Sequence, residues 1–551
     1  MDLELLLAHA GDGTPVLESP LPLDAGRRDP PARLAEPSAH LADPSGDPDV
    51  LSSQRWVLVV PEGPRGERLR ALLDPLWQLR SEQQGRPADV LTLPAGADAE
   101  ALRRFRDTKL WPAGRRAREQ PRYVLLAGDP DVLPLELHET LAGDGFGFVG
   151  RLAFDDEEDY GAYAAKVVEY EKHPGPERRA RSLFLAVRDG TVATKVGADL
   201  LMEPASVTCE EERQRGHLPA NEVIFADGPG DPGSELLRLA VSPGAGVLLS
   251  LSHGVGAPRT GWASAEEQRL RQGALSLGDG AELTPRDVGE QPFMPGGAWF
   301  AFACYSAGTP KRSPYLPWLE LLAQEEGRKC VHPVLAARPL DGRPFIAKIA
   351  QAALANPRGP VAFIGHLDLA WSTSFYDEAT GRLYADRFVQ VIAGLVKGRR
   401  VGPSLHGLTR FAQQVDVELR DRYQRAAEAG AGVADATTET LRLAQLWMMR
   451  HDLASYVVLG DPAGRLVMNG AGAGRVDPLD TRERARLSGP QSLSDERVEQ
   501  AVLAVLSGER SAEDVARAFG MDASVLRTWA DTYRNAGRAA LRAIRGAGSA
   551  K

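Results

Sequence analysis

Short segments that are apolar at every position are the feature that most constrains how this 551-residue chain can fold. Such continuous runs are typical of parallel strands that are covered on both faces. Amphipathic stretches between them, such as Glu67–Gln84, Asp98–Arg106 and Tyr160–Lys172, predict helices. The alternation predicts an α/β fold with a mostly parallel sheet sandwiched by helices. The predicted strands are Trp56–Val60, Val90–Leu93, Tyr123–Ala127, Ser182–Val187, Glu222–Ala226, Gly246–Ser252, Ala298–Ala303, Val331–Ala336, Val361–Ile364 and Tyr456–Leu459.

Shifts in composition predict how the chain divides into domains. Residues 1–52 are rich in Pro, Asp, Ala and Gly and predict an irregular leader, with one short element at Leu3–Ala8 as the exception. We expect an N-terminal α/β subdomain over residues 53–180 and the main domain over residues 181–468. A Gly-, Pro- and Arg-rich linker, 469–492, then leads to a small all-helical domain, 493–551.

Charge and cysteine content exclude several classes of protein. The net charge of −10 argues against nucleic acid or a membrane surface as the main partner of the whole chain. Three cysteines cannot build a disulfide framework, which indicates a reducing compartment and a cytoplasmic location. The acidic N-terminus does not resemble a secretory signal, and no apolar run reaches the roughly 18 residues that span a bilayer. The cysteines lack zinc-site spacing and there is no phosphate-binding loop, so we expect neither metal nor cofactor.

Two predicted strands end in residues that carry thiol chemistry. His253 and Gly254 follow one strand, and Cys304 follows another strand 51 residues after His253. A nearby imidazole can take the proton of a thiol and make it a nucleophile. We expect the backbone N–H groups of Gly254 and Cys304 to face the oxyanion that forms on a substrate carbonyl. A lone cysteine or histidine at such a place is more often structural, and we interpret Cys209 and Cys330 in that way.

These motifs resemble those of the caspase-like (clan CD) cysteine peptidases, which include caspases, gingipains, separase and CHAT-domain proteases. The shared pattern is a strand followed by His-Gly, then about 50 residues later a strand followed by Ala-Cys-x-Ser-x-Gly. The segment Ala303–Ser306 lacks the glutamine that precedes the caspase cysteine, so the bacterial gingipain-type and CHAT branches are more similar. The resemblance covers residues 120–465. Further segments that resemble bacterial members are Tyr123–Pro130, Val149–Arg151, Gly365–Trp371 and Tyr456–Pro462.

The resemblance implies roles for individual residues. Cys304 matches the nucleophile, His253 the general base and acid, and Gly254 the glycine of the oxyanion hole. It also implies an endopeptidase that needs no metal or organic cofactor and cleaves after a charged residue, called P1.

Acidic side chains after two strands bear on the charge of that P1 residue. Asp227 follows one predicted strand, and Asp368 and Trp371 follow another. An acid at either place would pair with a basic P1 residue. The alternative is that each aspartate is solvated or caps a turn. The acidic run Asp155–Asp159 is interpreted as a solvated loop and helix start, with Ca²⁺ binding or an acidic exosite as alternatives.

The C-terminal residues have a helix-turn-helix pattern. Ser511 precedes a short apolar-periodic stretch, Gly520 supplies a turn, and a second stretch ends at Trp529. The pattern resembles the helix-turn-helix of transposases and homeodomain-like proteins. Residues 481–551 carry 12 basic and 9 acidic side chains, and from Ser524 onward the count is 6 against 1. The candidate contacts to nucleic acid or to a partner are Arg527, Arg534 and Arg538.

The sequence therefore predicts a cysteine endopeptidase that acts on protein or peptide substrates, in regulated proteolysis or bacterial defence. Its C-terminal domain would contact an activating or sensor protein. DNA contact is less favoured, because few residues there could read bases. The alternative is a catalytically silent caspase-like scaffold, or a DNA-binding regulator that acts through its C-terminal domain.

Overall fold

The chain forms two compact units, Met1–Gly470 and Ala471–Lys551, in the computed structural model. In the first unit the structure describes residues 2–3, 5–17, 19, 21–22, 47–112, 120–142, 146–173, 179–226, 232–241, 246–324, 331–378, 380–429 and 436–468. In the second unit it describes residues 505, 511, 512, 515, 516, 523, 526, 527 and 530.

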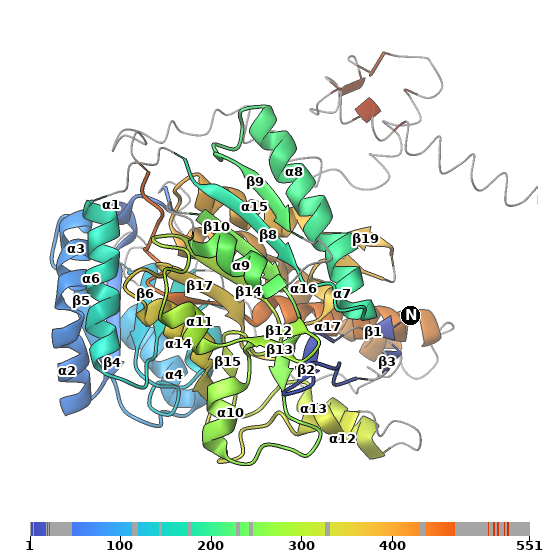
Figure 1. Cartoon of the computed structure of the whole chain (residues 1–551), viewed down its shortest axis with the longest axis horizontal. Helices are drawn as coiled ribbons and strands as arrows, with labels where there is room; N and C mark the ends of the chain where they lie inside the picture. Colours follow the sequence, from blue (N-terminus) through green and yellow to red (C-terminus); the bar gives the residue numbers. More distant parts are fainter. Residues whose placement is uncertain are drawn as a thin grey trace, which may run out of the picture. The chain divides into compact units, whose positions relative to one another are not determined.

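A ten-stranded sheet forms the centre of the first unit (Figure 1). Its strand order is β5-β4-β6-β7-β20-β17-β14-β10-β8-β9. Its strands are β4 (Trp56–Pro61), β5 (Asp89–Leu93), β6 (Tyr123–Ala127), β7 (Phe148–Leu152), β8 (Arg181–Ala186), β9 (Val223–Ala226), β10 (Gly246–Leu251), β14 (Ala298–Phe302), β17 (Ala362–His366) and β20 (Tyr456–Gly460).

The sheet consists of two parallel halves that run in opposite directions. All neighbouring strands pair in parallel except β17 and β20, which pair antiparallel. The half built from β8, β9, β10, β14 and β17 therefore collects the carboxyl ends of its strands at a single edge. The other half, from β4 to β7 with β20, presents its carboxyl ends at the opposite edge.

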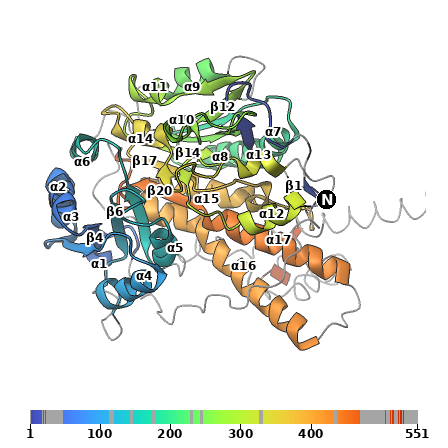
Figure 2. The ribbon, with the colours of Figure 1, turned by 90° about the horizontal axis from the view of Figure 1, so that it is seen from below.

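Helices cover both faces of this sheet (Figure 2). One face carries α2 (Pro64–Leu72), α3 (Asp74–Gln84), α6 (Glu158–Lys172), α9 (Pro232–Val241) and α14 (Lys348–Ala355). The other carries α4 (Ala99–Phe105), α5 (Glu136–Ala142), α7 (Val192–Gly197), α8 (Glu203–Gln214), α15 (Ala385–Val396), α16 (Val401–Ala429) and α17 (Ala436–Ala454). This arrangement confirms the predicted α/β fold, with a mostly parallel sheet between two layers of helices.

Short elements connect these layers. The helices are α1 (Leu51–Gln54), α10 (Ala265–Arg271), α11 (Pro285–Gly289), α12 (Leu316–Gln324) and α13 (His332–Leu335). The strand pairs are β1 (Asp2–Leu3) with β3 (Leu21–Pro22), β15 (Gly308–Thr309) with β16 (Phe345–Ile346), and β18 (Tyr376–Asp377) with β19 (Arg382–Leu383).

A second sheet of four strands lies beside the carboxyl ends of β10 and β14. Its order is β13-β12-β11-β2, with β11 (Gly254–Gly256), β12 (Leu275–Gly278), β13 (Ala281–Leu283) and β2 (Leu7–His9). Strand β2 belongs to the first 52 residues and pairs in parallel with β11. The N-terminal segment is therefore built into the first unit rather than lying outside it.

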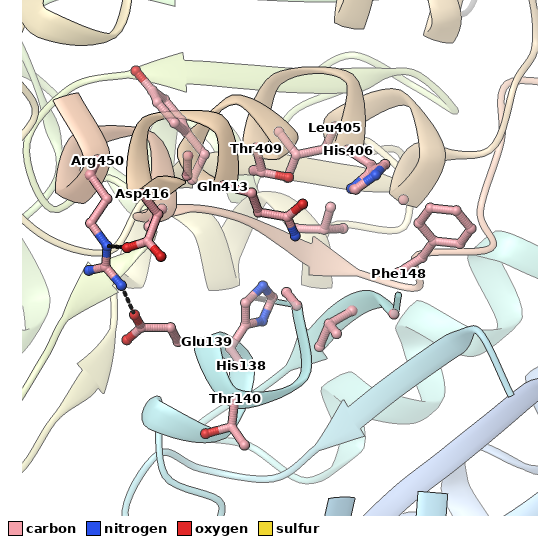
Figure 3. Close-up of a pocket in the computed structure, with 18 of the residues that line it drawn as sticks. His138, Glu139, Thr140, Phe148, Leu405, His406, Thr409, Gln413, Asp416 and Arg450 are labelled. Atoms are coloured by element: carbon pink, nitrogen blue, oxygen red, sulfur yellow. Dashed lines mark hydrogen bonds and ion pairs between the residues drawn. The ribbon is translucent and has the colours of Figure 1, made fainter. Parts of the chain in front are cut away.

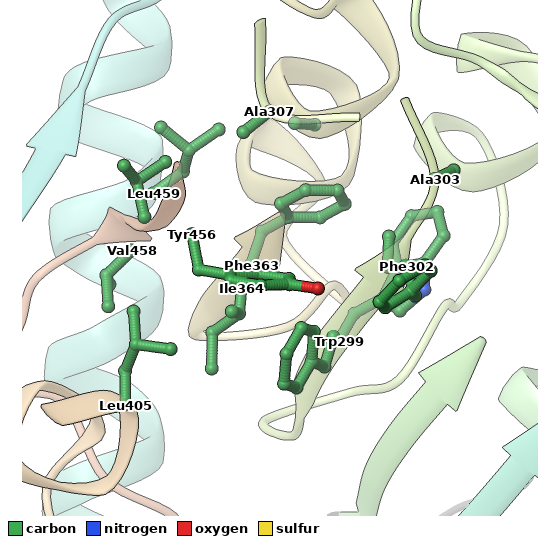
Figure 4. Packing of buried hydrophobic residues seen from close by; sticks show 14 of the residues in the cluster. Trp299, Phe302, Ala303, Ala307, Phe363, Ile364, Leu405, Tyr456, Val458 and Leu459 are labelled. Atoms are coloured by element: carbon green, nitrogen blue, oxygen red, sulfur yellow. The ribbon is translucent and has the colours of Figure 1, made fainter. Parts of the chain in front are cut away.

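The strands are apolar throughout because both faces of the sheet are buried. Every residue of β14 is fully buried, and Figure 4 shows how its side chains pack against those of β17 and β20. The rings of Trp299 and Phe363 meet edge to face with centroids 4.9 Å apart. The indole N–H of Trp299 donates to the hydroxyl of Ser250 at 2.9 Å, so its polar atom is satisfied inside the core.

Three further differences from the sequence prediction have a local physical cause. Val331–Ala336 was predicted as a strand, but α13 lies there, and Pro333 stands in its first turn, where a missing N–H costs nothing. Strand β7 was not predicted, because Gly150 and Arg151 interrupt its apolar pattern. The predicted helix Glu67–Gln84 is two helices, since Pro75 cannot continue an uninterrupted helix.

The described residues of the second unit are helical, apart from Ser511. The N–H of Val515 donates to the carbonyl of Ser511 at 3.0 Å, as in a helical turn. Val515, Ala516 and Leu526 are buried, as the sequence pattern predicts. Within the described part of the chain, none of the helices combines the length and the apolar character that crossing a bilayer requires.

A buried cluster of charges connects three elements of the first unit. Arg80 on α3 pairs with Glu171 on α6 at 2.7 Å and with Asp461, just after β20, at 2.6 Å. The indole N–H of Trp56 also donates to Asp461, at 3.0 Å. The Arg80 and Asp461 side chains are fully buried, so removing the arginine would leave two carboxylates without their counter-charge.

We therefore predict that Arg80→Ala lowers the free energy of unfolding by about 3–5 kcal/mol. Urea denaturation measures this change. Arg104→Ala serves as the control because its ion pair with Glu100 is exposed, and little change is expected. Equal effects of the two substitutions would contradict a structural role for the buried cluster.

Candidate active site

The pairing of β10 with β14 brings two predicted site residues to one edge of the sheet. Leu251 and Phe302 are direct partners in this parallel pair. His253 and Cys304 each lie two residues further along their chains. The N–H of Ser252 donates to the carbonyl of Phe302 at 3.3 Å, which keeps the two chains together beyond the strands.

The N–H groups of Gly254 and Cys304 converge on one carbonyl oxygen. Both donate to the carbonyl of Leu6, at 2.8 Å and 3.3 Å respectively. A Cβ atom on residue 254 would lie 1.9 Å from the carbonyl oxygen of Cys304, so only glycine allows this approach. The two donors predicted to bind an oxyanion are thus placed side by side with a peptide carbonyl between them.

The thiol of Cys304 is closed off from solvent beside the backbone of Ala370. Its sulfur accepts the N–H of Ala370 at 3.2 Å, and the residue is fully buried. Burial raises the pKa of the thiol well above its usual value, although the Ala370 N–H favours the thiolate. The next residue, Tyr305, has a φ of +58°, which an L-residue adopts at a cost in energy. The N–H of Tyr305 donates to the carbonyl of Asp368 at 2.8 Å, and this bond helps to hold the strained turn.

The imidazole of His253 is oriented through one of its two nitrogens. Its Nε2 lies 2.9 Å from the hydroxyl of Thr191 and 3.5 Å from the carboxylate of Asp189. Its Nδ1 has no hydrogen-bond partner among the described residues. Burial lowers the pKa of His253 to about 4, although the charge of Asp189 acts in the opposite direction. The ring is therefore neutral near pH 7, and Nδ1 is the nitrogen that none of the described residues engages.

Asp189 was not predicted from the sequence. It follows β8, the strand on the other side of β10, so it belongs to the same edge of the sheet. Its carboxylate accepts the hydroxyl of Thr194 at 2.7 Å and the N–H of Thr191 at 3.1 Å, which fixes its position. In the sequence, Asp189-Gly190 resembles an ordinary turn. The available signal was its place just after a predicted strand.

Asp368 and Trp371 lie after β17, on the side of β14 away from β10. Asp368 is buried, and one of its carboxylate oxygens accepts the N–H of Leu369 at 2.7 Å. Burial raises its pKa to about 6. The N–H of Trp371 donates to the buried carboxylate of Asp452 at 3.0 Å. His366 lies 3.1 Å from the same carboxylate, so this pair anchors the loop that carries Asp368.

Other predicted residues lie elsewhere or cannot be placed. Asp227, Cys330, Arg534 and Arg538 lie outside the described residues. Arg527 is described and its side chain is exposed. The run Asp155–Asp159 spans the turn before α6 and the first two residues of this helix, and Asp155 pairs with Lys348 at 2.6 Å. Among the residues that the structure describes, no cluster of histidine, cysteine or acidic side chains could hold a metal ion.

A separate cavity of about 510 Å³ lies between β7, β20, α5 and α16 (Figure 3). Arg450 lines it and joins Asp416 at 3.1 Å and Glu139 at 3.5 Å. His138 and His406 also line it, and burial lowers their pKa values to about 3 and about 4. None of the predicted site residues lines this cavity. The candidate active site is therefore distinct from this large cavity.

Comparison with protein families gives a match for one segment of the chain. Residues 499–549 match the family model described as a helix-turn-helix domain, which confirms the prediction for this segment. No curated protein matches the sequence.

Three solved structures resemble the fold at low identity. One, described as "Structure of Protease", is 13% identical with a TM-score of 0.44, over 75% of this chain and 79% of the other. The complex of the pro- and mature domains of RgpB from Porphyromonas gingivalis is 15% identical with a TM-score of 0.42, over 75% and 80%. The separase–securin complex of Saccharomyces cerevisiae is 8% identical with a TM-score of 0.25, over 62% and 16%.

The raised pKa of Asp368 predicts a pH-dependent gain in stability from Asp368→Asn. The pKa of Asp368 is about 6 in the folded protein, against 3.8 for the free group. The folded state therefore binds this proton more tightly than the unfolded state, and the stability that the proton contributes is lost as the pH rises. The difference in the free energy of unfolding between Asp368→Asn and wild type should shift in favour of the variant by about 2 kcal/mol between about pH 4.5 and about pH 7.5. Urea denaturation at both pH values measures it. A difference that does not change with pH would contradict the burial of an ionisable Asp368.

Proposed function

We propose that the first unit is a cysteine endopeptidase with Cys304 as nucleophile and His253 as base. The observation that carries the proposal is the pair of N–H groups, from Gly254 and Cys304, that bind one peptide carbonyl oxygen next to a thiol. Two backbone donors aimed at a single carbonyl are the arrangement that stabilises the tetrahedral intermediate of acyl transfer. The imidazole from the neighbouring strand end supplies the base that such a thiol needs.

The arrangement assigns a step to each group. His253 takes the proton of the Cys304 thiol, and the thiolate attacks the carbonyl carbon of the substrate. The N–H groups of Gly254 and Cys304 hold the oxyanion. The protonated His253 then gives its proton to the leaving amine, and water hydrolyses the thioester. Because Thr191 and Asp189 engage Nε2, we assign the proton transfers to Nδ1, while the charge of Asp189 stabilises the imidazolium.

We further propose that the residue before the cleaved bond is basic. The support is Asp368, whose side chain is buried. Its backbone carbonyl accepts the N–H of Tyr305, the residue after Cys304. A basic side chain that reached this carboxylate would compensate its charge. Asp227 remains part of this proposal on the basis of its place in the sequence. A reducing compartment would keep such a thiol free, and we propose a cytoplasmic role in regulated proteolysis or bacterial defence.

The proposal predicts that Cys304→Ala lowers peptide cleavage by at least about a thousandfold, because the nucleophile is lost. Fluorogenic peptides with Arg, Lys, Asp or Leu at P1 measure both the rate and the preference, with Arg and Lys expected to be cleaved fastest. Cys209→Ala is the matched control, since Cys209 is a buried thiol on α8, away from the site. Undiminished cleavage by Cys304→Ala would overturn the assignment of the nucleophile.

The family match of residues 499–549 favours a second function for the C-terminal unit, the binding of duplex DNA. A helix-turn-helix places its second helix in the major groove, and basic residues contact the phosphates. The excess of basic residues after Ser524 supports this assignment. The alternative partner is an activating or sensor protein that docks on the same unit.

DNA binding predicts that Arg527→Ala weakens binding of the full chain to unrelated duplexes about equally and lowers the dependence of affinity on salt. Fluorescence anisotropy at several salt concentrations measures both effects. Arg104→Ala, which removes an exposed arginine of the first unit, is the control. If the wild-type chain does not bind DNA even at low salt, the proposed DNA binding is wrong.

A further inference from the structure

The N-terminal segment lies in the candidate active site as an extended strand. The carbonyl of Leu6 accepts the two N–H groups from Gly254 and Cys304. On one side of Leu6, residues Leu7–His9 pair in parallel with β11. On the other side, Leu5 forms an antiparallel bridge with Trp371. The backbone is thus held before, at and after the carbonyl that occupies the oxyanion site.

This is the way in which an extended peptide substrate binds to a peptidase. Addition of a strand to an exposed edge supplies main-chain hydrogen bonds, and the reacting carbonyl enters the oxyanion site. We propose, on the basis of the function proposed above, that Leu5–His9 is a built-in pseudosubstrate. It occupies the substrate groove, with Leu6 in the P1 position, and holds the peptidase inactive until it is displaced. Because leucine cannot pair with Asp368 as the proposed basic P1 residue would, the segment differs from the preferred substrate at this position.

The bound segment identifies the parts of the groove. Strand β11 holds the residues after the cleavable bond, and Trp371 holds the residue before P1. The residue just after that bond, Leu7, is fully buried. A Cβ on Gly256 would lie 2.9 Å from the Leu7 side chain, so this glycine leaves the room that Leu7 fills. The groove therefore favours extended protein segments with an apolar residue directly after the cleaved bond.

Contacts beyond the groove anchor the segment. The N–H of Val16 donates to the carbonyl of Leu7 at 2.9 Å, and Ala8 bridges to Pro15. In the turn that joins Leu7–His9 to Pro15 and Val16, the N–H of Gly11 donates to Glu282 at 3.2 Å. Arg259 pairs there with Asp12 at 3.3 Å, and both side chains are about half exposed. This exposed turn is the part that a displacing partner would reach first.

The segment explains why the thiol and the imidazole are sealed from solvent. Cys304 and His253 are both fully buried with the segment in place. Hydrolysis of a thioester needs water at Cys304, and a peptide substrate needs the edge of β11 that β2 already occupies. In the proposed resting state, Cys304 and His253 are therefore in place but covered by the segment.

The test compares full-length variants that release the segment to different degrees. Leu7→Ala removes part of the buried side chain, and Leu7→Asp places a charge at a fully buried position. Val50→Asp, which adds the same charge at an exposed position, is the control. Two quantities are measured, the rate at which iodoacetamide alkylates Cys304, read by peptide mass spectrometry, and the rate of fluorogenic peptide cleavage. Thermal unfolding checks that each variant remains folded.

We expect alkylation of Cys304 and cleavage both to rise, by at least about tenfold in Leu7→Asp and less in Leu7→Ala, with Val50→Asp like wild type. Alkylation that is as fast in wild type as in both Leu7 variants would overturn the pseudosubstrate. If alkylation rises but no cleavage depends on Cys304, the segment does cover the thiol, and the proposed peptidase function fails instead. If Leu7→Asp does not fold, Leu7→Ala alone gives the comparison.

Discussion

The in-register parallel pairing of β8, β10, β14 and β17 is the constraint on which the candidate active site depends. Because each strand ends at the same edge, the chain leaves the sheet at four adjacent points. These exits deliver Asp189, His253, Cys304 and Asp368 from segments that are far apart in the sequence. Packing against helices on both faces fixes the register, since a slip by one residue would move every side chain of a strand to the opposite face, against a different layer of helices. The chemistry of the site is thus a consequence of how the core packs.

Burial at this edge has two opposite electrostatic effects. It lowers the pKa of His253 and keeps the imidazole neutral, as a base requires. It also raises the pKa of the Cys304 thiol, which favours the protonated thiol while the N-terminal segment covers it. Opening the groove to water would weaken both effects, because desolvation causes them. If the segment covers the site as proposed, the same burial excludes solvent and favours the protonated thiol.

The sequence allowed the strand ends, with His253 and Cys304 just after two of them, to be predicted, because continuous apolar runs and a cysteine or histidine after a strand are local patterns. The helix at His332–Leu335 was missed, since a short apolar run does not distinguish a buried strand from a helix. Asp189 was missed because its role depends on the neighbouring strand and not on its local sequence. The position of Leu6 could not have been predicted either, because its partners, Gly254 and Cys304, lie more than 200 residues away. Contacts of that range depend on the packed fold and leave no periodic signal.

Covalent labelling by a substrate-like electrophile tests the central claim most directly. Peptidyl acyloxymethyl ketones that end in Arg or Leu would be added to wild type, to Leu7→Asp and to Leu7→Asp with His253→Ala, followed by peptide mass spectrometry. The account predicts one adduct, on Cys304, that forms readily in Leu7→Asp, slowly in wild type and not without His253. The absence of an adduct on Cys304 in Leu7→Asp, or equal labelling of Cys209, would contradict it.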